Sequence, residues 1–151
     1  EATNLARFPE RGDQMNQLTQ FALENLSSHE DGFFLMIEGS QVDWAGHDND
    51  AEWMIQEMID FDNVVGDVLE FAKNDGNTLV IVTSDHETGG LSLLRGETNA
   101  DVSYHFSSDY HSAVAVPVMS YGPSAEIFSG HYDNTDLARK MFELWGKTIS
   151  N

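Results

Sequence analysis

The stretch GFFLMIEGSQVDWAGH, residues 32–47, joins an apolar run to a series of acid and imidazole side chains. Residues 33–37 are continuously apolar and lie between two glycines, which is typical of a parallel strand covered on both faces. Glu38 follows this predicted strand, and Asp43 and His47 come next, four residues apart. If Asp43 and His47 share a helical turn, their side chains point the same way and can hold one ion.

A strand-helix-strand unit is predicted from the residues that follow. Apolar residues alternate at spacings of four and three over residues 50–73, with Met58 on the apolar side and Asp60 on the opposite side. This pattern predicts a long amphipathic helix whose acidic face meets solvent. The β-branched run at residues 78–83 then predicts a second strand, joined to the first by a right-handed crossover.

Asp85 and His86 lie just beyond that second strand, and His111 stands before a further apolar run. In open α/β sheets, ligands bind outside the carboxyl ends of the strands. A carboxylate with an imidazole is a common catalytic zinc pairing that leaves a position open for water or substrate. The residues predicted to converge on a metal site are therefore Glu38, Asp43, His47, Asp85, His86 and His111.

The rest of the chain predicts a mixed α/β arrangement. Helices are expected at residues 13–26 and from residue 133 or 134 to 145, from their periodic apolar positions. Short antiparallel strands are expected at residues 91–94 and 102–106, and another strand at 114–121 with Pro117 at an edge or bulge.

Composition limits the possible functions. The 151 residues suit one domain, over residues 1–151, and the absence of cysteine leaves only His and carboxylate ligands for zinc. A net charge of −19 makes nucleic-acid binding through basic patches improbable. Neither a transmembrane run nor a signal peptide is evident, so the chain is expected to be soluble.

Three quoted segments carry a resemblance to a known family. GFFLMIEGSQVDWAGH, the later NTLVIVTSDHETGG, and His111 ahead of VAVPVMSYGPSAE together resemble the C-terminal part of alkaline phosphatases. The resemblance implies part of a three-layer α/β sandwich, a mostly parallel sheet flanked by helices. It also implies hydrolysis of phosphate monoesters, two zinc ions and one magnesium ion, a homodimeric full-length enzyme, and a periplasmic or secreted location.

The resemblance assigns the metals residue by residue. Asp43, His47 and His111 resemble the ligands of the first zinc, Asp85 and His86 those of the second, and Glu38 a magnesium ligand. In that family a serine in an Asp-Ser-Ala motif is phosphorylated, but this sequence contains no Asp-Ser dipeptide. No catalytic nucleophile is therefore assigned, and the chain alone is expected to be inactive.

Two other functions stay open. Phosphodiesterases and sulfatases of the wider superfamily share an aspartate with a nearby histidine, an Asp-His pair and a later histidine. The glutamate at position 38, ahead of Ser40 and Gln41, favours the phosphatases because it suits a third metal site. The second alternative is a non-catalytic acidic domain that binds metal, although the spacing of an EF-hand calcium loop is absent.

Overall fold

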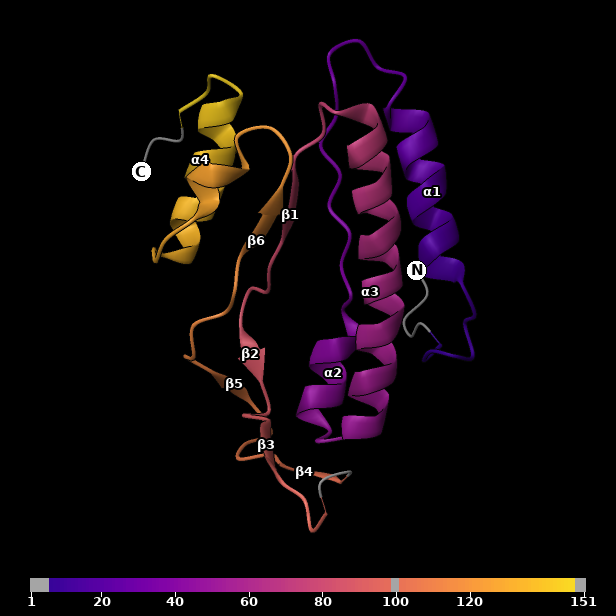
Figure 1. Cartoon of the computed structure of the whole chain (residues 1–151), viewed down its shortest axis with the longest axis vertical. Coiled ribbons are helices and arrows are strands. Elements are labelled where there is room, and N and C mark those ends of the chain that lie inside the picture. Colours follow the sequence, from indigo (N-terminus) through magenta and orange to yellow (C-terminus); the bar gives the residue numbers. More distant parts are fainter. Residues whose placement is uncertain (1–5, 99–100, 149–151) are drawn as a thin grey trace. The chain divides into compact units, whose positions relative to one another are not determined.

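The computed structural model describes residues 6–98 and 101–148, whose helices and strands are shown in Figure 1. Two compact units are present: Glu1–Asp67 with His86–Val114, and Val68–Asp85 with Ala115–Asn151. The elements of the first unit are α1 (Gln14–Leu26), α2 (Gln41–His47), β2 (Glu87–Thr88), β3 (Ser92–Arg95), β4 (Val102–His105) and β5 (His111–Ser112). Those of the second are β1 (Val80–Val82), β6 (Met119–Tyr121), η1 (Ala125–Phe128) and α4 (Asn134–Leu144), and α3 (Ala51–Asp75) passes through both.

Helix α1 lies along α3 in the first unit (Figure 1). The side-chain amides of Asn16 and Gln20 donate to Oδ2 of Asp67 at 2.6 and 3.0 Å. These two donors hold the pKa of Asp67 below its ordinary value. Leu23 of α1 and Val64 of α3 are buried in the same unit, so polar bonds and apolar burial both fix this helix pair.

The long helix was predicted correctly, and its buried face was predicted in part, since Ala72 is buried as expected. Asp50 caps α3, since its carboxylate accepts the N–H of Trp53 at 3.1 Å. Met58, expected on the buried face, is 49% exposed, whereas Asp60, expected in solvent, is 4% exposed. Although α3 has 25 residues, neither it nor any other described helix is apolar enough over a sufficient length to cross a membrane.

A buried ion cluster explains why Asp60 lies inside. Arg11 Nη2 lies 2.6 Å from Oε2 of Glu57 and 2.5 Å from Oδ2 of Asp60, with the three side chains only 2–5% exposed. The other carboxylate oxygen of Glu57 accepts the N–H of Phe8 at 2.9 Å and the indole N–H of Trp53 at 3.0 Å. One face of α3 thus buries carboxylates because a distant arginine meets them there.

The cluster shifts the ionisation of its members. Burial alone would raise the pKa of Glu57, but the hydrogen bonds from Arg11, Phe8 and Trp53 outweigh it and lower the pKa. Burial would likewise lower the pKa of Arg11, yet its bonds to Glu57 and Asp60 raise it. Both groups are therefore held in their charged forms.

The described strands form three antiparallel pairs. β3 pairs with β4, which confirms the hairpin predicted near residues 91–106. In the second unit β1 pairs with β6, and β6 is shorter than the predicted strand at 114–121. Pro117 precedes β6, since a proline has no N–H to donate to a ladder. Its carbonyl accepts the hydroxyl of Thr83 at 3.1 Å.

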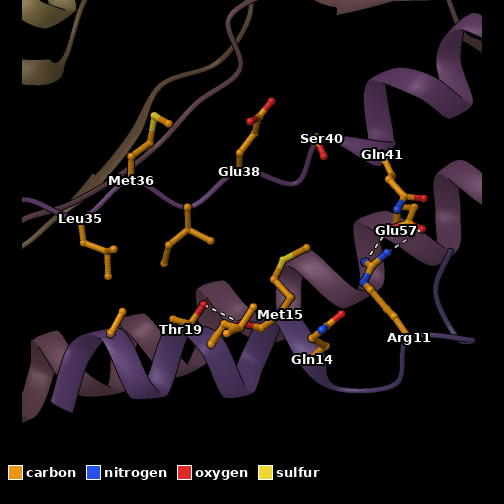
Figure 2. Close-up of a pocket in the computed structure, with 13 residues that line it drawn as sticks. Arg11, Gln14, Met15, Thr19, Leu35, Met36, Glu38, Ser40, Gln41 and Glu57 are labelled. Carbon is orange, nitrogen blue, oxygen red and sulfur yellow. Dashed lines mark hydrogen bonds and ion pairs between the residues drawn. The ribbon is translucent and has the colours of Figure 1, made fainter. Parts of the chain in front are cut away.

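The predicted strand at residues 33–37 lies outside the three described sheets. Figure 2 shows that it is nevertheless extended, because Leu35 points toward α1 whereas Met36 points to the opposite side. The expected mostly parallel sheet is thus not assembled by the described strands, all of whose pairings are antiparallel. An apolar extended run becomes a sheet strand only where another strand offers its main-chain groups.

We predict that Arg11→Met lowers the free energy of unfolding by about 3–5 kcal/mol, because it leaves two buried carboxylates without a cation. Urea denaturation followed by circular dichroism measures the change. Arg139→Met is the matched control, since Arg139 makes a solvent-exposed pair with Asp136 and its loss should cost less than about 1 kcal/mol. Equal losses in the two variants would contradict a structural role for the buried cluster.

Candidate functional site

Helix α2 and strand β2 bring the first polar side chains together. Asp43 and His47 lie four residues apart on α2, as the sequence predicted, and Asp43 Oδ2 lies 3.5 Å from His47 Nε2. The helix can approach β2 because position 46 is glycine: a Cβ there would stand 2.9 Å from the carbonyl oxygen of Thr88. The close contact places α2 directly beside the residues that follow His86.

Asp43, His86 and His111 form one group of possible metal ligands, with one ligand atom from each within 4.8 Å of the others. Oδ1 of Asp43 lies 3.9 Å from Nδ1 of His86 and 3.6 Å from Nε2 of His111. The imidazole rings of His86 and His111 are stacked, with centroids 3.6 Å apart. The pairing of β2 with β5, in which Thr88 stands opposite His111, brings these two histidines together.

His47 joins the same group through a second set of contacts. Its Nε2 lies 3.1 Å from Nε2 of His111, in addition to its contact with Asp43. Ligand atoms bound tetrahedrally to zinc at about 2.0–2.1 Å stand about 3.3–3.4 Å from one another. Nε2 of His47 lies 3.5 Å from Oδ2 of Asp43, Nε2 of His111 lies 3.6 Å from Oδ1, and the two nitrogens are 3.1 Å apart. These separations are close to that spacing, although the two histidines meet different oxygens of the carboxylate.

Hydrogen bonds set the histidine tautomers. Nδ1 of His47 lies 2.8 Å from the main-chain carbonyl oxygen of Asp109, and because a carbonyl only accepts, Nδ1 carries the hydrogen. In the neutral imidazole Nε2 then has the lone pair that a metal needs. The hydroxyl of Thr88 donates to Oδ1 of Asp43 at 2.5 Å, so its oxygen can accept the Nδ1 hydrogen of His86 at 3.2 Å. Both bonds are of the kind that orients histidine ligands in metal sites.

The loop before His111 is held against β2. The N–H of Gly89 donates to the carbonyl of Tyr110 at 3.0 Å, and the carbonyl of Gly89 accepts the N–H groups of Ser107 and Ser108 at 3.1 and 3.2 Å. The Tyr110 ring stacks on His111 with centroids 5.0 Å apart and meets His47 edge-on at 5.8 Å. The exposed Tyr110 ring therefore lies against both imidazoles.

Two of the predicted ligands lie outside this group. Glu38 is exposed and points to the same side of the extended segment as Met36, away from α1 (Figure 2), and it is not among the clustered ligands of the described residues. Asp85 belongs to the second unit, whereas the clustered ligands all belong to the first. The magnesium role of Glu38 and the zinc role of Asp85 stay predictions.

Thr88 was missed in the sequence, although one signal pointed to it. It stands two residues after His86 in an extended segment, where residues two apart share a face. Glu87, between them, accepts the N–H of Gly90 at 2.7 Å and the hydroxyl of Ser112. Its carboxylate thus joins β2 to β5 and does not lie with the clustered ligands.

A family model described as alkaline phosphatase matches residues 2–103 of the chain. Alkaline phosphatase 4 of Bacillus subtilis is 46% identical over a match that covers 86% of this chain and 43% of the relative. Alkaline phosphatase of Escherichia coli is 37% identical over 88% of this chain and 32% of the relative. The chain therefore spans less than half the length of these curated relatives.

The solved structures include alkaline phosphatase from the Antarctic bacterium TAB5, with a TM-score of 0.84 and 44% identity over 89% of this chain and 41% of that chain. A variant of the TAB5 enzyme with Mg bound in its M3 site has a TM-score of 0.85 and 36% identity, covering 99% of this chain and 52% of that chain. These similarities confirm the predicted α/β fold of the alkaline phosphatase type.

The contact of α2 with β2 yields a matched pair of glycine substitutions. We predict that Gly46→Ala destabilises the chain by about 1–3 kcal/mol, because the new methyl group collides with the main chain of Thr88. Gly66→Ala, in α3 with nothing within 4 Å of its Cβ position, should instead stabilise by about 0.5–1 kcal/mol. Thermal and urea unfolding measure both, and stabilisation by Gly46→Ala would show that α2 does not approach β2 this closely.

Proposed function

Because this chain belongs to the alkaline phosphatase family, we propose that it forms the C-terminal, metal-binding part of an enzyme that hydrolyses phosphate monoesters. The observation that carries the proposal is the convergence of Asp43, His47, His86 and His111 through α2, β2 and β5. The donor set also supports it, since carboxylate and neutral imidazole are the ligands of catalytic zinc sites.

The proposed ligands follow the family pattern. Asp43, His47 and His111 would hold one zinc ion, Asp85 and His86 a second, and Glu38 a magnesium ion. When bound, such metals supply a Lewis acid for the phosphoryl oxygens and lower the pKa of an attacking oxygen. The Mg bound in the M3 site of a TAB5 variant supports magnesium as the third ion.

Hydrogen bonds from other residues of this chain would orient the ligands of that site. The Asp109 carbonyl keeps a hydrogen on Nδ1 of His47, and Thr88 links His86 to the carboxylate of Asp43. These contacts hold the imidazole nitrogens toward the metal position before a substrate arrives. Because the chain carries a net charge of −19, an anionic phosphate monoester would be attracted by bound cations and not by the protein surface as a whole.

The nucleophile would come from a segment outside this sequence. The chain spans 43% and 32% of the two curated relatives described above, and it has no Asp-Ser dipeptide. We therefore propose that the chain alone binds metal without turning over substrate. A homodimeric full-length enzyme and a periplasmic or secreted location belong to the same proposal.

Zinc binding tests the proposal most directly. Isothermal titration calorimetry of the chain should show a zinc site whose affinity falls at least about 100-fold in His47→Ala and His111→Ala, since even the loss of a group behind a ligand costs 10–100-fold. His29→Ala is the control, because His29 is exposed and lies outside the ligand group of the described residues. The chain should not hydrolyse p-nitrophenyl phosphate. An unchanged zinc affinity in His47→Ala and His111→Ala would overturn the proposed ligand set.

Thr88→Val should lower zinc affinity by about 10–100-fold while leaving every ligand in place, because it removes the hydroxyl between Asp43 and His86. Thr88→Ser keeps the hydroxyl and should retain most of the affinity. Thr83→Val is a second control, since the Thr83 hydroxyl is bonded to Pro117. Equal affinity in Thr88→Val and the native chain would mean that the hydroxyl does not orient the ligands.

A further inference from the structure

The ring of Tyr110 lies beside the candidate metal ligands and is still largely in solvent. It stacks on the imidazole of His111, with centroids 5.0 Å apart and planes inclined by 29°, and it meets the ring of His47 edge-on at 5.8 Å. Tyr110 is nevertheless 67% exposed. All three residues belong to the first unit, so these contacts lie within one compact body. The ring therefore offers aromatic surface, next to a polar site, that the described residues leave uncovered.

The main chain that carries this ring is held on both sides of the side chain. The N–H of Tyr110 donates to Oγ of Ser108 at 2.9 Å, and its carbonyl accepts the N–H of Gly89 at 3.0 Å. A tyrosine side chain has only two torsion angles, so little conformational entropy is lost when a ligand packs against it. The position of Tyr110 thus suits a contact surface for a bound molecule.

The ring differs in chemistry from the side chains that it touches. The imidazoles of His47 and His111 suit a cation, and through a bound metal they would serve the phosphoryl oxygens of a substrate. A phosphate monoester also carries an organic group, which has to leave the metal position past the side chains that surround these histidines. An exposed aromatic ring can bind such a group by stacking when the group is itself aromatic.

We propose that Tyr110 contacts the organic group of the ester and makes the site prefer aryl phosphates to small alkyl phosphates. This inference rests on the proposed function. Contacts between aromatic rings favour association by about 2- to 12-fold beyond the effect of buried area. Tyr110 would therefore determine which ester binds best, while metal and phosphate binding would not require it.

The same contacts are compatible with a second role, in which the ring only positions the two imidazoles. That role predicts that loss of the ring lowers zinc affinity and weakens every phosphorus ligand alike. Contact with the organic group predicts a loss confined to aryl ligands. The two roles are separated by comparing ligands that differ only in their organic group.

Calorimetric titration of the zinc-loaded chain with phenylphosphonate, methylphosphonate and inorganic phosphate makes that comparison without requiring turnover. In the native chain phenylphosphonate should bind at least about threefold more tightly than methylphosphonate. In Tyr110→Ala this ratio should fall at least about threefold, while the affinities for zinc and inorganic phosphate stay within about twofold of native. Tyr110→Phe keeps the ring and should keep the ratio.

Tyr104→Ala is the matched control. Tyr104 is 53% exposed in β4 of the same unit, and its ring meets Phe106 edge-on at 6.0 Å. Its loss should leave the ratio unchanged. Nuclear Overhauser effects between the phenyl protons of bound phenylphosphonate and the ring protons of Tyr110, absent in Tyr110→Ala, would show the contact directly.

The outcomes distinguish this inference from the proposed function. A chain that binds no zinc, or that binds zinc but none of the three phosphorus compounds, overturns the proposed function and the inference with it. Binding of zinc and phosphate without an aryl preference, or a preference that persists in Tyr110→Ala, overturns the inference alone. A parallel loss of affinity for zinc and for all three compounds in Tyr110→Ala would show that the ring only positions the imidazoles.

Discussion

The close approach of α2 to β2 is the constraint on which the site depends. Gly46 leaves no side chain between the helix and the main chain of Thr88, and this lets the Thr88 hydroxyl reach the carboxylate of Asp43 at 2.5 Å. β2 in turn pairs with β5 and brings His111 to the same place. A wider spacing between helix and strand would separate the carboxylate from its imidazoles, so one glycine governs the geometry of the whole group.

The position of α2 is itself fixed by the segment that precedes α1. The carbonyl of Ala6 accepts hydrogen bonds from Nη1 of Arg11 at 3.2 Å and from the side-chain amide of Gln41 at 3.1 Å. Arg11 also holds Glu57 and Asp60 of α3. One short segment therefore ties the start of α2 to α3. Replacing a buried ion cluster by apolar residues is often neutral or stabilising, so its use here is better understood as fixing the position of these elements than as adding stability.

The net charge of the protein is negative, whereas its group of candidate ligands suits a positively charged ion. The net charge of −19 disfavours anionic partners at long range, while the clustered imidazoles and carboxylate suit a cation that would attract an anion at close range. In the function proposed above, bound metal ions would supply the positive charge that meets the phosphate.

The sequence predicted the features that depend on local spacing. α1, α3, α4 and the β3–β4 hairpin follow from periodicity and turn residues, and Asp43 and His47 fall on one helical face because they stand four residues apart. The candidate ligands outside that helix were predicted from their places near the ends of the predicted strands, and only their assignment to particular metals came from family motifs. Thr88 was missed because its role depends on an aspartate 45 residues away in sequence.

By itself, then, the sequence determined which segments are helical, which side chains are candidate metal ligands, and to which family the motifs point. The tertiary structure decided that Asp60 is buried, because Arg11, 49 residues away, meets it there. It also decided that residues 33–37 lie outside the described sheets, because a strand needs a neighbour and no property of the run itself supplies one. Ion pairs and strand pairing join distant parts of the chain, and local periodicity carries no information about those distances.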